Sequence, residues 1–309
     1  MRLETCSKTL FTLLGLIVAG SANAGVTRDQ DTESHYVPTG KGWGEHHGLQ
    51  QGQAGKTSSA TSSNGISYHG GPVILGTTNV YYIWYGNWDG NSSARPTLES
   101  FANGIGGSPY YNINTTYYNS SKVKVSNAVK LSGETNDSYS QGTALSDAAV
   151  KTVVTNAITA GGLPLDANGV YFVLTSADVN ETSGFCTQYC GWHTHGSVGS
   201  KDIKYAFVGN PDRCPSACEA QSTGPNGNAG ADAMASIIAH ELEEAVSDPD
   251  LNAWFDNRGY ENADKCAWKF GSIYKASNGA YANMKLNGLD FLIQQNWVND
   301  KGGYCALSY

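Results

Sequence analysis

The hydrophobic pattern of the chain changes near residues 24 and 65. A short apolar run follows two basic residues at the N-terminus and precedes the small residues Ala22, Asn23 and Ala24. This order is typical of a secretory signal peptide, and we predict cleavage after Ala24. Residues 25–65 are polar and rich in Gly, Ser, Thr and Gln, without periodicity. We expect a poorly ordered leader or linker there, followed by one domain over residues 66–309.

Within the domain, apolar β-branched segments alternate with segments of helical period. The predicted strands, of which the first two have hairpin spacing, are Val73–Leu75, Val80–Tyr85, Lys122–Leu131, Val170–Leu174 and Ile203–Val208. The predicted helices are Arg95–Ile105, Pro109–Tyr118, Thr143–Ala160 and Asp232–Ser247. A cysteine-rich loop is expected between the last two strands. Because strands alternate with helices, we predict an α/β (α+β) fold: a zincin-like single domain with a mixed, partly parallel sheet and packed helices.

The last predicted helix carries the candidate chemistry. His240 and Glu244 are four residues apart, so they project from one helical face and can bind one cation. At 100° per residue, Glu241 falls inside the apolar arc, whereas Glu243 falls on the opposite, solvent-facing side. A carboxylate among apolar side chains is costly unless a charge or a hydrogen bond meets it. A bound metal ion with its water would do so, and we predict that Glu241 is a catalytic base.

The order His-Glu-x-x-Glu resembles the HExxH helix of zinc proteases, in which two ligands flank a general base. We therefore expect a divalent metal, with Zn²⁺ preferred, bound by His240, Glu244 and a third ligand from a later segment. Glu261, seventeen residues after Glu244, is the predicted third ligand. Asp264 is expected to orient the second ring nitrogen of His240. Asp248, one turn beyond Glu244, is the competing ligand.

Two further histidines, His193 and His195, follow Cys190 in the sequence CGWHTHG. An HxH pair can bind metal, so both are accessory candidates. The alternative is that they are surface or structural residues of a disulfide-linked loop. Catalysis by a Ser-His-Asp triad is not indicated, because the chain contains no GxSxG motif.

Six cysteines remain after removal of the predicted signal, which contains Cys6. An even number in an exported chain indicates disulfides. The two CxxxC spacings favour local bridges and leave the last two cysteines to each other. The expected pairs are Cys186 with Cys190, Cys214 with Cys218, and Cys266 with Cys305. A four-cysteine zinc knuckle is the weaker alternative, because such sites favour CxxC spacing and a reducing compartment.

The net charge and the hydropathy of the chain exclude some classes of binding partner. Loss of Arg2, Lys8 and Glu4 with the signal takes the formal net charge from −8 to −9. A negative chain argues against nucleic acid or an anionic membrane as a partner. No other segment approaches the ~20 apolar residues of a membrane span. We expect a secreted, extracellular monomer with an unknown peptide or cell-wall substrate.

Longer motifs carry a family resemblance. They are YHGGPVILGTTNVYYIWYGNW, GVYFVLTSADV, FCTQYCGWH, KYAFVGN, CPSAC, IIAHELEEAVSDPDLNAWFD and YENADKC. From about residue 66 to the C-terminus, the chain resembles the EXORDIUM-like, or phosphate-induced, secreted proteins. The family's HELxE and E-x-x-D-x-C patterns fall on His240, Glu241, Glu244, Glu261, Asp264 and Cys266. Plant relatives typically carry Asn at the position of Asp248, so the resemblance favours Glu261 as the ligand. It implies an extracellular, cell-wall-associated protein and no particular activity.

Two functions are consistent with these features. The first is a secreted metal-dependent hydrolase, in the first instance a peptidase, with Glu241 as the base. The second is a non-catalytic extracellular protein whose metal braces the fold, with a cell-wall or glycan-binding role. The buried position predicted for Glu241 favours the enzyme, because a purely structural metal site needs no extra carboxylate there.

Overall fold

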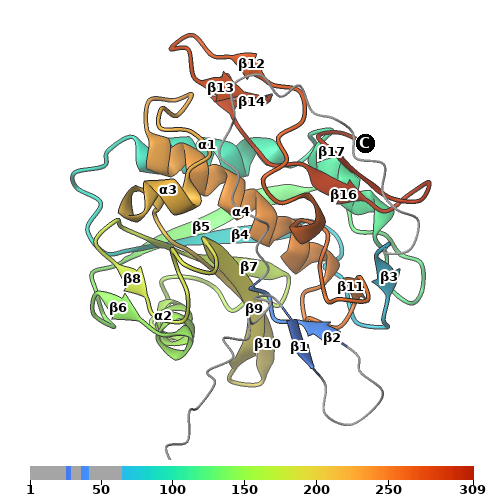
Figure 1. The fold of residues 1–309 in the computed structure, drawn as a ribbon. Helices are drawn as coiled ribbons and strands as arrows, with labels where there is room; N and C mark the ends of the chain where they lie inside the picture. The colour runs from blue at the N-terminus through green and yellow to red at the C-terminus, as the bar shows by residue number, and fades with distance from the viewer. Residues whose placement is uncertain (1–25, 29–35, 42–64) are drawn as a thin grey trace, which may run out of the picture.

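The computed structural model describes residues 26–28, 36–41 and 65–309 (Figure 1). The predicted signal peptide and its cleavage site lie outside these residues, as does most of the predicted leader. Two short leader strands, Val26–Arg28 (β1) and Tyr36–Pro38 (β2), pair antiparallel. None of the helices in these described ranges has both the length and the hydropathy that a bilayer crossing requires.

A five-stranded sheet forms the centre of the domain, in the order β5-β4-β7-β10-β9. Its strands are Thr78–Tyr85 (β4), Val129–Asp137 (β5), Gly169–Thr175 (β7), Gly191–Val198 (β9) and Lys201–Val208 (β10). The first four strands in this order are mutually parallel, and β9 pairs antiparallel with β10 at one edge. Strands β4 and β7 are apolar and almost wholly buried, as expected for parallel strands covered on both faces. The prediction of a mixed, partly parallel sheet is confirmed.

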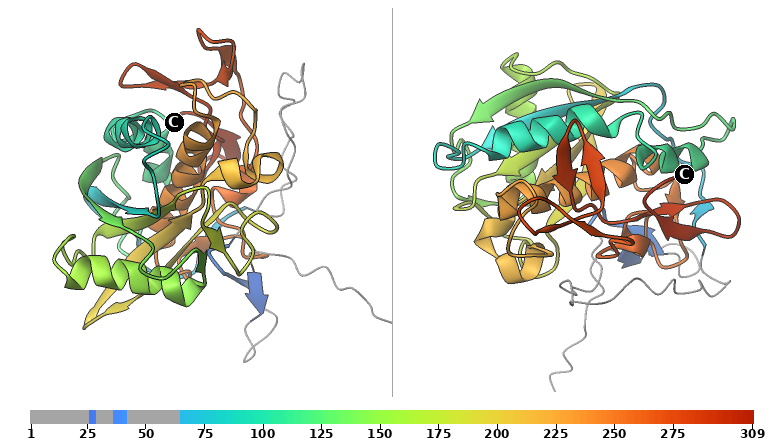
Figure 2. Two further views of the ribbon diagram at one scale, coloured as in Figure 1. Left: turned by 90° about the vertical axis from the view of Figure 1, so that its left-hand side faces the viewer. Right: turned by 90° about the horizontal axis from the view of Figure 1, so that it is seen from above.

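Helices cover both faces of this sheet (Figures 1 and 2). Helices α1 (Ala94–Ile105) and α4 (Ala229–Ser247) lie side by side on one face, and α2 (Asp147–Thr159) lies on the other. Helix α4 begins at Asn228, whose side chain accepts a hydrogen bond from the N–H of Ala231. It ends at Ser247, as predicted, because Pro249 disfavours helical geometry at Asp248.

The chain after α4 forms small paired strands and turns. Their bounds are Trp254–Phe255 (β11, paired with β3, Ser67–Tyr68), Asp264–Cys266 (η3), Tyr274–Lys275 (β12) with Tyr281–Ala282 (β13), Met284–Leu286 (β14) with Leu289–Phe291 (β15), and Asn296–Val298 (β16) with Tyr304–Ala306 (β17). This segment covers the side of α1 and α4 that faces away from the sheet (Figure 2). Helix α4 is therefore enclosed by the sheet, α1 and the C-terminal segment.

Some predicted elements differ from the structure. Val73–Leu75 is not a strand, and β4 instead pairs with β5 and β7. The strand predicted from Lys122 begins only at Val129 and continues to Asp137. The helix predicted from Pro109 is a short 3₁₀ segment, Tyr111–Thr116 (η1). Strand β9 lies where a loop was predicted, because an edge strand rich in Gly and His lacks the apolar signal of a central one.

Two of the predicted disulfides are wrong. The bridges join Cys186 with Cys214, Cys190 with Cys218, and Cys266 with Cys305. The CxxxC segments thus pair with each other, which leaves no free thiolate among them for a zinc knuckle. Cys214 caps the single helical turn α3 (Pro215–Cys218) and Cys218 ends it, and residues four apart on a helix have Cβ atoms about 5–6 Å apart. A disulfide needs about 3.5–4.5 Å. The third bridge is the predicted one.

Candidate metal centre

Helix α4 buries every member of its HELEE motif. His240 is 7% exposed, Glu241 2%, and both Glu243 and Glu244 0%. The prediction that Glu243 faces solvent is wrong, because the C-terminal segment covers that side of the helix. Its carboxylate accepts a hydrogen bond from Nδ2 of Asn296. Burial raises the pKa of Glu243 well above its usual value, and the groups of close ligand atoms among the described residues do not include it.

His240 lies at one end of a cluster of carboxylates. Its Nε2 is 3.1 Å from Oε1 of Glu244 and 3.6 Å from Oδ1 of Asp264. Potential ligand atoms of His240, Glu241 and Glu244 all lie within 4.8 Å of one another. The helical spacing thus brings together the predicted pair and the predicted base. Asp264, from the turn η3, reaches the same ring nitrogen as Glu244.

The other nitrogen of His240 contacts a residue that the sequence did not point to. Nδ1 lies 2.9 Å from the side-chain amide of Gln294, whose nitrogen also donates to the carbonyl of Ala263 at 3.2 Å. Gln294, not Asp264, therefore orients the imidazole. A cation on Nε2 requires a proton on Nδ1, and the reversed amide that accepts this proton gives up its hydrogen bond to Ala263. No motif marks Gln294, which lies 54 residues after His240.

A second group of ligand atoms adjoins the first. His193, from β9, places Nε2 3.2 Å from both carboxylate oxygens of Glu261 and 3.6 Å from Oε2 of Glu244. His193 and Glu261 are each 1% exposed. The structure therefore brings Glu261 to His193, whereas the sequence paired it with His240. Glu244 is the residue that both groups share.

The remaining candidates lie outside these two groups. His195 follows His193 by two residues on β9 and sits nearer the surface, where it contacts Asp202 at 3.0 Å. Oδ1 of Asp248 accepts hydrogen bonds from the N–H groups of Asn252 and Ala253 at 2.6 and 2.5 Å. Asp248 thus stabilises the turn after α4, and burial raises its pKa to about 7.

The centre contains buried polar atoms that need a partner. Oε2 of Glu241, Oε2 of Glu244 and Oδ1 of Asp264 are buried and have no hydrogen-bond partner among the described residues. Such atoms are rare in folded proteins and are costly unless an ion or a water meets them. Oxygen and imidazole donors at this spacing fit a divalent cation.

The pKa shifts of the metal-free centre agree with a site for a divalent cation. Burial raises the pKa of Glu241 and Glu261 well above the usual value, and burial together with the charge of Asp264 raises that of Glu244. Burial lowers the pKa of His193 to about 4. Burial also lowers the pKa of His240, but Glu244 and Asp264 raise it further, so it lies well above normal. A cation would replace the protons that these carboxylates otherwise hold.

A pocket leads to one side of the centre. It is lined by His240 and Glu241 together with the apolar side chains of Ile237, Phe270 and Leu292, and its internal volume is about 60 Å³. A water needs roughly 10–15 Å³ of such volume, so several waters or one short substrate group fit. His193, Glu244 and Glu261 are not among the lining residues. The His240 group therefore faces the pocket, and the His193 group lies behind it.

Gly191, at the start of β9, allows this strand to pass close to α4. A Cβ atom there would lie 2.6 Å from Cγ2 of Ile237 and 2.9 Å from Oε1 of Glu241. Only glycine leaves room for both side chains. Gly191 was not among the predicted site residues, although it directly follows Cys190 in the motif that contains His193.

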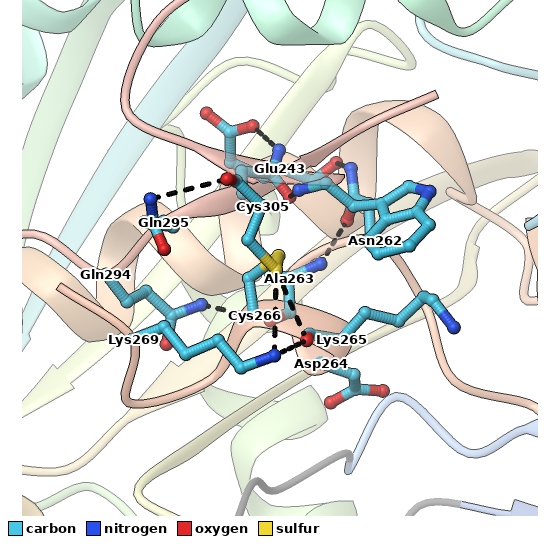
Figure 3. The surroundings of a disulfide bond; sticks show 12 residues. Glu243, Asn262, Ala263, Asp264, Lys265, Cys266, Lys269, Gln294, Gln295 and Cys305 are labelled. Carbon is cyan, nitrogen blue, oxygen red and sulfur yellow. Dashed lines mark hydrogen bonds between the residues drawn. A yellow bond between two sulfur atoms is a disulfide. The ribbon is translucent and has the colours of Figure 1, made fainter. Parts of the chain in front are cut away.

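The Cys266–Cys305 disulfide ties the segment that carries Glu261 and Asp264 to the C-terminus, as predicted (Figure 3). Figure 3 also shows Gln294 bonded to Ala263 in the same segment. The carboxylates from beyond α4 are thus held by a covalent bridge and by the residue that orients His240.

Comparison with known proteins places this chain in a family. Residues 66–305 match the phosphate-induced protein 1 conserved region, so the chain belongs to that family. It is 32% identical over 272 residues to Protein EXORDIUM-like 5 of Arabidopsis thaliana, covering 75% of each chain. It is 26% identical over 221 residues to Protein PHOSPHATE-INDUCED 1 of Nicotiana tabacum, covering 62% of this chain and 67% of that protein. No solved structure matches. The family expected from the sequence motifs is confirmed.

Proposed function

We propose that this protein is a secreted metal-dependent hydrolase with peptidase-like chemistry, in which His240 and Glu244 bind a divalent cation and Glu241 is the general base. One observation carries the proposal. The carboxyl group of Glu241 is buried, has an unpartnered oxygen, and lines the pocket beside His240. A cation that only braced the fold would not need a further carboxylate facing a pocket.

Asp264 is the preferred third ligand of the ion that faces the pocket. Its unpartnered Oδ1 and Oε1 of Glu244 both face Nε2 of His240. Zn²⁺ is the preferred ion, because histidine and carboxylate donors with an open position are typical of catalytic zinc. The antiparallel edge strand of the sheet, β9, packs against the helix that carries His240.

The chemistry follows from the positions of these side chains. A bound divalent ion supplies a Lewis acid that polarises a substrate carbonyl and acidifies water. Glu241, whose pKa burial raises well above its usual value, accepts the proton of a water in the pocket and delivers it to the leaving amine. Gln294 keeps the ring of His240 in place. The apolar pocket walls exclude bulk water, which strengthens the electrostatic interactions inside.

The burial of the inner ligands favours a second function, in which the metal is structural. His193, Glu244 and Glu261 are all buried, and a disulfide holds the segment that carries Glu261. A metal there would brace the fold of a non-catalytic extracellular protein, with a cell-wall or glycan-binding role. The three disulfides are typical of an exported chain under either function.

The deciding experiment combines metal analysis with the substitution Glu241→Gln, which keeps the size of the side chain and removes the base. Metal-loaded wild-type protein is incubated with a fluorogenic peptide library and with cell-wall polysaccharides. The proposal expects peptide turnover that falls about 10²–10⁴-fold in the variant, with the metal content unchanged. Full activity of the variant rules out Glu241 as the base. No turnover of any substrate by the loaded wild type favours the structural role.

A further inference from the structure

We infer that the centre binds two divalent cations, bridged by Glu244: one at His240 facing the pocket, and a second, inner one at His193 and Glu261. This rests on the proposed function for the first ion only. The second ion does not depend on that function, because its ligands His193 and Glu261 do not line the pocket.

The two oxygens of Glu244 point to different histidines. Oε1 lies 3.1 Å from Nε2 of His240, and Oε2 lies 3.6 Å from Nε2 of His193. Among the described residues, the groups of mutually close ligand atoms place Glu261 with His193 and not with His240. One ion therefore satisfies one group and leaves the other without a cation. A carboxylate with one oxygen in each group is suited to bridge two metals, which in dinuclear sites are about 3.5–4 Å apart.

The inner position has its own unsatisfied ligand. Oε2 of Glu244 is fully buried, has no hydrogen-bond partner among the described residues, and faces His193. The Nε2 atom of His193 is at a similar distance, 3.2 Å, from both oxygens of Glu261. A separation of about 3 Å is ordinary for two ligands about 2.0–2.2 Å from one zinc ion.

The charge of the centre favours two ions. Glu241, Glu244, Glu261 and Asp264 supply four carboxylates within a buried cluster. A single divalent cation would offset half of their negative charge when they are ionised, whereas two would offset all of it. The ion pairs of Glu244 and Glu261 are with His193 and His240, and a histidine that binds a cation does so as a neutral ring, so it adds no positive charge to the loaded centre.

A second ion would also increase the ability of the first ion to acidify water. Two carboxylate ligands neutralise the charge of a single zinc ion and leave nearby water less acidic than three histidines would. When Glu244 divides its charge between two cations, the ion facing the pocket keeps more of its own. The inner ion therefore acts on the reaction through Glu244, without contacting the substrate.

The test is the metal stoichiometry of the full secreted protein. The protein is stripped with a chelator, reloaded with Zn²⁺, desalted, and analysed by elemental analysis and calorimetric titration. We expect two equivalents for the wild type, one for His193→Ala and one for His240→Ala. Ser197→Ala, at an exposed position of the same strand, is the control and should keep two. Circular dichroism of each variant verifies that it is folded.

The outcomes separate the two proposals. A single equivalent in the wild type that His193→Ala leaves unchanged overturns the second ion and leaves the proposed function standing. No bound metal overturns both. X-ray absorption on the loaded wild type does not depend on any variant folding: a metal–metal distance near 3.5–4 Å supports the inference, and its absence in protein holding two equivalents contradicts a shared Glu244.

Discussion

Nε2 of His193 lies 3.2 Å from each carboxylate oxygen of Glu261, although 68 residues separate the two along the chain. One side chain comes from the edge strand β9, and the other from the segment before η3. Their contact joins the sheet to the C-terminal segment beneath α4. It also explains why Glu261 is buried without being near His240, and it defines the inner half of the centre.

Substitution of Glu243 and of Glu244, which are adjacent on α4, by Gln should affect metal affinity differently. Glu243→Gln replaces a group that burial keeps protonated, so metal affinity should change less than about threefold. Glu244→Gln removes a ligand oxygen and should lower the affinity by at least two orders of magnitude. Competition with a zinc-binding dye measures both. Equal effects of the two substitutions would contradict the assignment of Glu244 as a ligand and Glu243 as a structural acid.

Gln294 should control metal affinity through His240. Gln294→Leu removes the hydrogen bond to Nδ1, and loss of such an orienting partner typically costs 10–100-fold in affinity. Gln294→Glu supplies an acceptor for a proton on Nδ1 and should largely restore binding. The dye competition assay applies here too. A Leu variant that binds zinc as tightly as the wild type would show that the ring needs no such partner.

Asp248 should make the metal-free protein less stable as pH rises. Its folded pKa, about 7, lies above the ordinary value of 3.8 because burial disfavours the charge. This contribution to stability is complete below pH 4 and is lost as pH rises through 7. Over that window the free energy of unfolding should fall by up to roughly 4 kcal/mol relative to Asp248→Asn. Urea unfolding in EDTA at pH 4, 6 and 8 tests this, and parallel pH profiles for the two proteins would refute it.

Gly191 should tolerate no side chain. In Gly191→Ala the new Cβ meets Ile237 and Glu241 at under 3 Å, and such overpacking typically costs about 1–3 kcal/mol. Gly90→Ala is the matched control, because a Cβ there meets nothing within 4 Å. Thermal unfolding compares the two. If both variants melt with the wild type, β9 does not pass α4 as closely as described.

Proteolysis should reveal that the disulfides join Cys186 to Cys214 and Cys190 to Cys218. Trypsin can cut after Lys201, Lys204 and Arg213, between the two CxxxC segments. Because the bridges join one segment to the other, the two tryptic peptides should stay linked until a reductant is added. Mass spectrometry with and without reduction distinguishes the cases. Peptides that separate without reductant would restore the local pairing.

The sequence by itself determined the features that depend on neighbours along the chain. The strands around residues 80–85, 170–174 and 203–208 and the end of α4 before Pro249 follow from local composition and backbone geometry. The burial of Glu241 follows from helical period, because its neighbours on that face are apolar. Family membership follows from motif order, which needs no coordinates.

Only the tertiary structure decided which distant groups meet. Helical period placed Glu243 in solvent because it cannot report that the C-terminal segment covers the second side of α4. Cysteine spacing favoured local bridges because it cannot show that the two CxxxC segments lie together. His193, Glu261 and Gln294 reach the centre from an edge strand and two later segments. Their meeting depends on long-range packing, for which the local pattern of the chain carries no signal.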